Sequence, residues 1–125
     1  MREILFKAKV KEEPNDWVEG YLSKCEREFI ISNDDGVGVF INPDTICQYT
    51  GLTDKNGNKI WENDVVKCNY NDYGEKGTYI GKVIFREDTC TFIVTDGKST
   101  DYEWWNEEKE VIGNIFDNPE LLKGE

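Results

Sequence analysis

Residues 48–66 read QYTGLTDKNGNKIWENDVV, and this stretch says more about the fold than any other part of the chain. Asn56 and Gly57 are residue types that supply the positive φ angles of a tight hairpin turn. Gly51 and Asp54 lie just before them, and we expect both to take part in the same turn-forming motif. The stretch therefore predicts a β-hairpin rather than a helix.

A second turn is predicted at residues 62–64, between two short apolar runs. Asn63 is one of the few non-glycine residues that tolerate a left-handed conformation. Asp64 can accept hydrogen bonds from the backbone amides of its own turn. Asn63 and Asp64 thus complete the predicted turn-forming motif.

The same stretch superficially resembles a calcium-binding loop, because Asp54, Asn56 and Asn58 offer oxygen atoms at alternating positions. The sixth position of such a loop needs glycine and holds Lys59, and the twelfth needs glutamate and holds Val65. We therefore favour the hairpin turn and expect no bound metal or cofactor.

Catalytic chemistry has little support in the sequence. The chain contains no histidine, no nucleophile elbow and no phosphate-binding glycine loop. Glu62 and Asp64 form an acidic pair, but such a pair performs acid–base chemistry only if both carboxylates converge on a pocket. A deep pocket that joined these two residues with Cys68 would indicate an enzyme of unrecognised type. We expect a non-enzymatic protein.

Patterns typical of strands continue on both sides of the central stretch. Before it they lie at residues 4–10, 17–22, 29–31 and 37–41, with a turn at 33–36. Within and after it they lie at residues 59–61, 65–68, 79–85, 91–94 and 110–116, and residues 101–105 fit a further strand. Residues 45–50 are short and mixed, and the polar residues 69–77 predict a loop. Asn118 and Pro119 predict the start of one short helix near the C-terminus.

These patterns predict an all-β fold made of two small β units, with the boundary at the composition shift of residues 42–47. The expected units are residues 1–47 and residues 48–125, within one compact structure. A chain of 125 residues is long enough to bury a core without disulfides or metals.

The chain carries 15 basic and 26 acidic side chains, which give a net charge of −11. The excess is spread: residues 1–47 hold 6 basic and 10 acidic groups, and residues 48–125 hold 9 and 16. Clustered lysine and arginine supply most nucleic-acid affinity, so direct nucleic-acid binding is disfavoured. The acidity indicates either solubility or a surface that meets a basic partner.

The chain shows no signal peptide and no membrane-spanning segment, because charges interrupt its opening residues and its apolar runs reach only three residues. These features predict a cytoplasmic protein. The four cysteines, at positions 25, 47, 68 and 90, form no CxxC pair. We expect mostly buried thiols, although a zinc site built from four separate segments stays open.

Tyr102, Trp104 and Trp105 form the strongest aromatic cluster of the sequence. On a strand, neighbouring side chains point to opposite faces, so one tryptophan would face the core and the other the outside. The outward ring is a candidate for contact with a partner or with a second copy. The alternative is that loops cover both rings.

The central stretch QYTGLTDKNG, followed by IWENDVV, resembles the YopX-like family of small phage and prophage proteins. The opening residues MREI and the ending EVIGNIFDNPELL are similar to that family's two ends. Asn63 stands where the family usually has glycine, and Lys9 where an aromatic residue is common. The resemblance implies a mostly β fold with a small SH3-like barrel in the second half, residues 48–125, on which the N-terminal β unit packs. It implies origin in a mobile element and a cytoplasmic location, and it carries over no activity and no catalytic residue.

Together these observations predict an accessory protein of a phage or prophage that acts through protein–protein contacts, or as an oligomer. The alternatives are a β-barrel that binds nucleic acid, which would need the nine basic residues of the second half on one face, and the unrecognised enzyme described above. The sequence does not name the partner.

Overall fold

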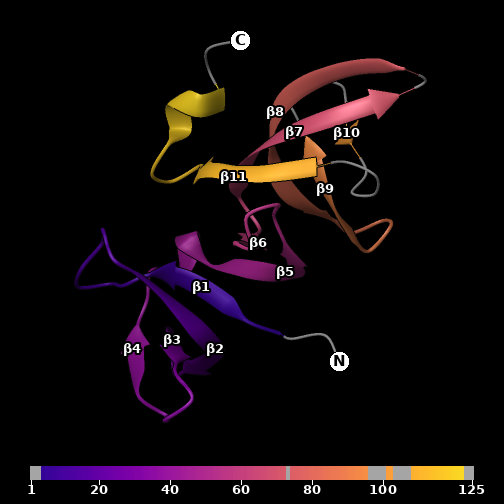
Figure 1. Ribbon diagram of the computed structural model, residues 1–125. Coiled ribbons are helices and arrows are strands. Elements are labelled where there is room, and N and C mark those ends of the chain that lie inside the picture. Colours follow the sequence, from indigo (N-terminus) through magenta and orange to yellow (C-terminus); the bar gives the residue numbers. More distant parts are fainter. Residues whose placement is uncertain (1–3, 73, 96–100, 103–107, 123–125) are drawn as a thin grey trace. The chain divides into compact units, whose positions relative to one another are not determined.

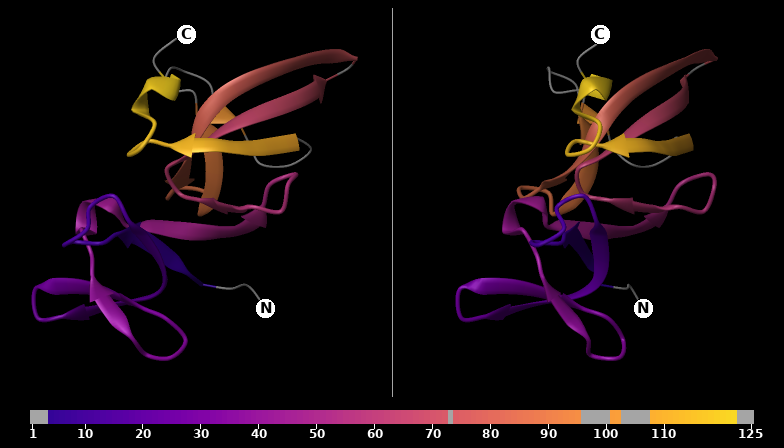
Figure 2. Two further views of the ribbon diagram at one scale, coloured as in Figure 1. Left: turned by 60° about the vertical axis from the view of Figure 1, so that its left-hand side comes forward. Right: turned by 90° about the vertical axis from the view of Figure 1, so that its left-hand side faces the viewer.

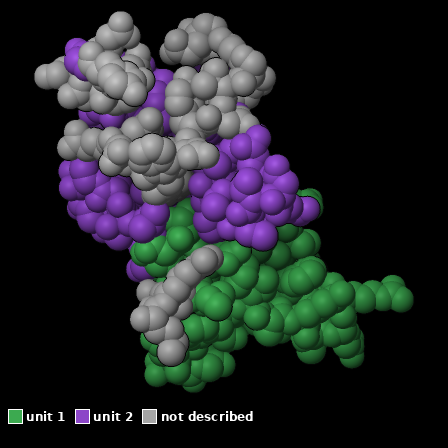
Figure 3. All heavy atoms as spheres, turned by 90° about the vertical axis from the view of Figure 1, so that its right-hand side faces the viewer, with its two compact units in different colours: residues 1–51 green, residues 52–125 purple. Residues whose placement is uncertain are grey.

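The computed structural model describes residues 4–72, 74–95, 101–102 and 108–122 (Figure 1). Within them the chain is all-β, as predicted: eleven strands accompany two single turns of 3₁₀ helix. The chain divides into two compact units, Met1–Gly51 and Leu52–Glu125, which Figure 3 colours separately. The division falls inside one strand, four residues beyond the expected boundary at residues 47–48.

Unit 1 is built from five antiparallel strands and one 3₁₀ turn. They are β1 (Phe6–Lys9), β2 (Trp17–Cys25), β3 (Glu28–Ser32), β4 (Gly38–Phe40), η1 (Pro43–Thr45) and β5 (Cys47–Thr53), of which the last passes into unit 2. Their order in the sheet is β4-β3-β2-β1-β5.

At Gly20 the strand β2 changes its pairing partner from β1 to β3. Up to Gly20 the strand pairs with β1, and from Tyr21 it pairs with β3. The backbone of Gly20 (φ 158°) approaches the carbonyl of Ser32 so closely that a Cβ atom would collide with it. Only glycine fits where two backbones come this close.

The far edge of unit 1 is partly closed by the segment that follows β1. Val10 bridges Ile41, the Lys11 N–H donates to the Phe40 carbonyl (2.9 Å), and the Asn42 N–H donates to the Lys9 carbonyl (2.9 Å). The enclosed core holds Ala8, Ile31 and Ile41, which are fully buried, with Phe6, Val18, Leu22, Phe29 and Ile46 packed around them. Unit 1 is thus a nearly closed small barrel with its own core.

Unit 2 begins with the end of β5 and the hairpin to β6 (Lys59–Trp61). It continues with β7 (Asp64–Asp72), β8 (Glu75–Arg86), β9 (Thr91–Thr95), β10 (Asp101–Tyr102), β11 (Glu108–Asn114) and a 3₁₀ turn, η2 (Pro119–Leu122). Five of these strands form an antiparallel sheet of order β10-β9-β8-β7-β11. The sheet is open in the described residues, so the barrel expected here is not closed, although its strands are compatible with one.

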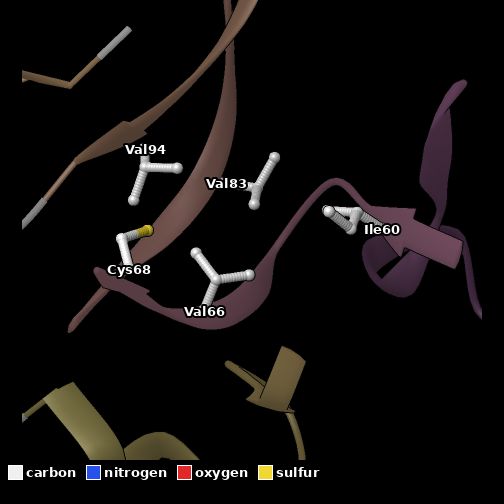
Figure 4. Packing of buried hydrophobic residues seen from close by; sticks show 5 residues of the cluster. All are labelled: Ile60, Val66, Cys68, Val83 and Val94. Atoms are coloured by element: carbon white, nitrogen blue, oxygen red, sulfur yellow. The ribbon is translucent and has the colours of Figure 1, made fainter. Parts of the chain in front are cut away.

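The core of unit 2 lies between β6 and the strands β7, β8 and β9. Figure 4 shows its fully buried side chains, which come from alternating strand positions: Ile60, Val66, Cys68, Val83 and Val94. Tyr79, Phe92 and Val111 pack against this cluster. Of the five buried residues, all but Cys68 are β-branched and favour the extended backbone.

One predicted loop was wrong, and one segment left unassigned contains a strand. Residues 69–72 form the end of β7 and residues 75–77 the start of β8, whose ladder continues to the pair Asp72 and Glu75. The mixed residues 45–50 include the first half of β5, which pairs with β1. In both places cross-strand pairing outweighs the local composition, within a hairpin in the first case and with the distant strand β1 in the second. The predicted C-terminal helix is present as the single turn η2.

Candidate interaction surface

The turn between β5 and β6 is organised by the carboxylate of Asp54. Its Oδ1 atom accepts hydrogen bonds from the N–H groups of Asn56 and Asn58, both at 2.9 Å. The Asp54 N–H donates to the Asn58 carbonyl (2.8 Å), and the Gly57 N–H donates to the Asp54 carbonyl (3.0 Å). Gly57 supplies the positive φ (84°) that closes the hairpin. Gly51 also has a positive φ (89°), in the strand that leads into this turn.

The second oxygen of Asp54 joins this turn to the last strand of unit 2. Its Oδ2 atom accepts from the N–H of Val111 in β11 (3.0 Å), and the Lys55 N–H donates to the Lys109 carbonyl (3.0 Å).

Asp54 is only 7% exposed. Burial alone would raise the pKa of Asp54. The hydrogen bonds donated by the Val111, Asn58 and Asn56 N–H groups and by the Asn58 side chain outweigh burial and lower the pKa below the ordinary 3.8.

The turn between β6 and β7 uses a similar carboxylate. Asn63 has a φ of 71°, the left-handed conformation that the sequence predicts for this asparagine. The Asp64 Oδ2 atom accepts from the Trp61 N–H (2.8 Å), and Asp64 is 3% exposed. Asn63 in turn links two other segments, because its N–H donates to the Val83 carbonyl and its own carbonyl accepts from the Ile115 N–H.

The turn-forming motif therefore holds the fold of unit 2 together. Both oxygens of Asp54 and the Oδ2 atom of Asp64 accept hydrogen bonds from backbone N–H groups, so both carboxylates have a structural role in these turns. Across the described residues no cluster of three or more metal-ligating side chains occurs. Cys25 and Cys90 are exposed, whereas Cys47 and Cys68 are buried in different units.

The aromatic cluster is only partly described. Trp104 and Trp105 lie outside the described residues, so their proposed role as contact residues stays a prediction. Tyr102 belongs to β10, where its backbone pairs with Val94 of β9.

A different apolar surface stands out in unit 1, around the edge strand β4 (Figure 1). Val37 is 64% exposed, Phe40 is 50% exposed and Val39 is 36% exposed. Tyr21 on β2 is also exposed, and its hydroxyl donates to the Asp34 carboxylate (3.0 Å). Contiguous exposed apolar side chains on a small protein commonly mark an interaction site.

The backbone of β4 is open on its outer side. The Ile41 N–H donates to the Phe29 carbonyl, and the Asn33 N–H to the Val37 carbonyl, so the odd-numbered residues of this segment face β3. In an antiparallel pair the intervening residues point their N–H and C=O groups away from the neighbour. Gly38 and Phe40 are those residues, and the Phe40 carbonyl indeed accepts from Lys11 instead. Within the described chain, the Gly38 N–H and C=O and the Phe40 N–H have no partner.

A shallow hollow lies beside this open edge. Its volume is about 300 Å³, and it is lined by Ser23, Ile30, Ser32, Gly36, Gly38, Val39 and Phe40. Gly38 adds no side chain to this lining. Ile30 and Ser32 pack closely over its backbone, because a Cβ atom there would lie 2.7 Å from Ile30 Cγ2 and 2.8 Å from Ser32 Oγ. Figure 1 labels β4 at the left-hand side of unit 1, and Figure 2 shows the same unit from two further directions. We call the open edge of β4 and this hollow the β4 edge site.

Sequence analysis predicted the strand at residues 37–41 but not its role as a site. The available signal was its composition: the run from Gly36 to Ile41 contains no charge and no proline. Natural edge strands usually carry such residues to prevent pairing with other chains. Position at the edge, however, is decided by pairing with β3 and cannot be read locally.

The fold and this surface define an all-β protein of two small antiparallel units. The model of the YopX protein family matches residues 3–123, nearly the whole chain, and the chain therefore belongs to that family. No curated protein matches the chain. The described residues also contain no helix of the length and hydropathy that crossing a membrane requires.

Lys9, which replaces an aromatic residue common in the family, has a clear local role. It lies opposite Trp17 across β1 and β2, with its ammonium group 5.5 Å from the centre of the indole ring. The ammonium group of Lys7 lies 4.7 Å from the same centre. Both distances fit cation–π contact with Trp17.

Proposed function

We propose that this protein is a non-enzymatic accessory protein of a phage or prophage that acts in the cytoplasm through protein–protein contact. Its contact surface is the β4 edge site. One observation carries the proposal: an uncharged edge strand with unpaired backbone groups and half-exposed apolar side chains lies beside a hollow. An extended segment can pair with such an edge and place side chains in the hollow.

Three further observations support contact rather than catalysis. The buried carboxylates Asp54 and Asp64 are engaged in turns. The chain contains no histidine to activate a nucleophile. The net charge of −11 disfavours nucleic acid and favours a basic protein surface. The phage or prophage origin rests on the resemblance of the central stretch and the two ends.

Affinity capture tests the proposal. The full-length chain, tagged and immobilised, is exposed to host lysate beside the variant Phe40→Ser and the control Leu52→Ser, which removes a similarly exposed apolar side chain from unit 2. We expect a specific protein that binds the wild type and the Leu52 variant and is lost with the Phe40 variant. A wild-type protein that is monomeric and captures no specific partner would contradict the proposal.

A further inference from the structure

The occupant of the β4 edge site can be defined more closely from its geometry and charge, if the proposed function holds. The open backbone groups lie at Gly38 and Phe40, on the side of β4 that faces away from β3. Residues 10 and 11 already pair with the end of this edge in the antiparallel direction, through the Val10 bridge to Ile41 and the Lys11 bond to Phe40. The edge can therefore accept a further extended segment of only a few residues.

The side-chain preference follows from the hollow. On the outer face of the sheet, Ser32 lies opposite Gly38 and Ile30 lies opposite Phe40. The hollow, of about 300 Å³, has room for one apolar group of the incoming segment, bordered by Phe40. Alternate side chains of an added strand point to the same face. One large apolar residue between polar neighbours fits this arrangement.

Acidic side chains stand at both ends of the open edge. Asp34 and Asp35 lie in the turn that precedes β4, and both are exposed. At the other end, Glu12 and Glu13 directly follow Lys11, whose N–H is bound to Phe40. Lys11 itself is paired with Glu28 (2.9 Å), so it offers little positive charge to balance them.

In the loop after β1, neighbouring carboxyl groups affect one another's protonation. The hydrogen bond between the side chains of Glu13 and Asp16, and the negative charge of Asp16, raise the pKa of Glu13. A second copy of this chain would bring the same acidic groups against one another. The charge therefore favours a different, basic chain.

We propose that the β4 edge site binds an extended, lysine- or arginine-rich segment of another protein, which adds a short antiparallel strand to β4 and places one apolar side chain in the hollow at Gly38. Main-chain pairing supplies affinity in this mode of recognition, and the pocket and charges supply specificity.

Synthetic peptides test this directly on the full-length protein. The probe is a seven-residue peptide in which lysine alternates with valine, phenylalanine and valine. The first control replaces every lysine with glutamate, and the second methylates the backbone nitrogen atoms that would face β4. Binding is measured by fluorescence anisotropy, and its location by the amide resonances of the protein.

We expect the lysine peptide to bind saturably, to shift the amide resonances of Gly38 and Phe40, and to weaken as salt rises. The glutamate and methylated peptides should bind at least about tenfold more weakly. The double variant Asp34→Asn with Asp35→Asn should reduce affinity for the lysine peptide while leaving the fold intact, because both side chains are exposed.

Three results would overturn the inference: equal binding of the glutamate peptide, equal binding of the methylated peptide, or shifts that leave Gly38 and Phe40 unchanged. A change of these two resonances on diluting the protein alone would identify a second copy as the occupant and would also overturn it. If lysate capture depends on Phe40 while none of the peptides binds, the proposed function stands and this choice of partner fails.

Discussion

The β3–β4 turn and the β5–β6 turn have the same hydrogen-bond pattern, but the first residue of one is exposed and that of the other is buried. In each, the Oδ1 atom of the first residue, Asn33 or Asp54, accepts from the N–H groups two and four residues later, at 2.9–3.0 Å. The glycine three residues later, Gly36 or Gly57, has a φ of 82° or 84° and donates to the first residue's carbonyl at 3.0 Å. The two segments therefore adopt the same type of turn.

The two turns differ in what lies beyond them. Asn33 is exposed, and its turn leads into the open edge of β4. Asp54 is buried, and its second carboxylate oxygen binds the N–H of Val111, 57 residues away. The same turn therefore leaves a strand open in unit 1 and joins a hairpin to the last strand in unit 2. The comparison separates residues that hold the fold from residues free to bind.

The largest expected effect is that of Asp54→Ala. This change removes the acceptor of three backbone N–H groups, including that of Val111, so we expect a loss of about 3 kcal/mol in the free energy of unfolding. Asn33→Ala removes two exposed hydrogen bonds and should cost about 1 kcal/mol or less. Urea denaturation measures both. Equal losses would show that the bond to β11 contributes little.

Asp54→Asn tests the charge of the same side chain, with an expected loss of about 2 kcal/mol at neutral pH, because hydrogen bonds to charged groups are stronger than those to neutral ones. The folded-state pKa of Asp54 lies below its ordinary 3.8, so its carboxylate stabilises the fold above that value. This contribution is lost as the pH falls from about that value through the lower folded-state pKa.

The stability difference between the wild type and Asp54→Asn should therefore shrink as acid is added. Denaturation curves at a series of pH values measure it. A difference that stays constant from neutral pH down to the acid limit of folding would contradict a charge effect at this residue.

Gly36→Ala and Gly57→Ala compare the two turns at their matching positions. Both glycines have a positive φ and open space where a Cβ atom would lie, so the cost arises from backbone strain alone. We expect each change to lower the free energy of unfolding by about 1 kcal/mol, and by similar amounts. A loss at Gly57 more than twice that at Gly36 would mean that burial also affects this position.

Val37→Ser should have the smallest effect on stability, within about 0.5 kcal/mol, because Val37 is 64% exposed and lies at the open edge. A thermal denaturation midpoint close to that of the wild type is the expected result. A loss above about 1 kcal/mol would indicate that this end of β4 is needed for the fold, and would weaken its assignment to a binding site.

The sequence predicted what local chemistry decides. Asx residues and glycine predicted the turn at residues 33–36, and Asn63 fits its left-handed position because its short polar side chain permits it. Contacts between residues far apart in the sequence could not be predicted. The bond from Asp54 to Val111 and the pairing of β7 with β11 depend on contacts with distant residues, which no local pattern contains. The site at β4 was missed for the same reason, since its open edge depends on the order of strands.

Amide hydrogen exchange in the full-length native protein tests the difference between the two turns most directly. The account predicts strong protection of the Val111 and Lys55 N–H groups, which bind Asp54 and the Lys109 carbonyl, together with strong protection of Val39, which faces β3. It predicts exchange of the Gly38 and Phe40 N–H groups at nearly the rate of an unstructured chain. Protection of Gly38 and Phe40 equal to that of Val39 would contradict the open edge, and rapid exchange of Val111 would contradict the link between the β5–β6 turn and β11.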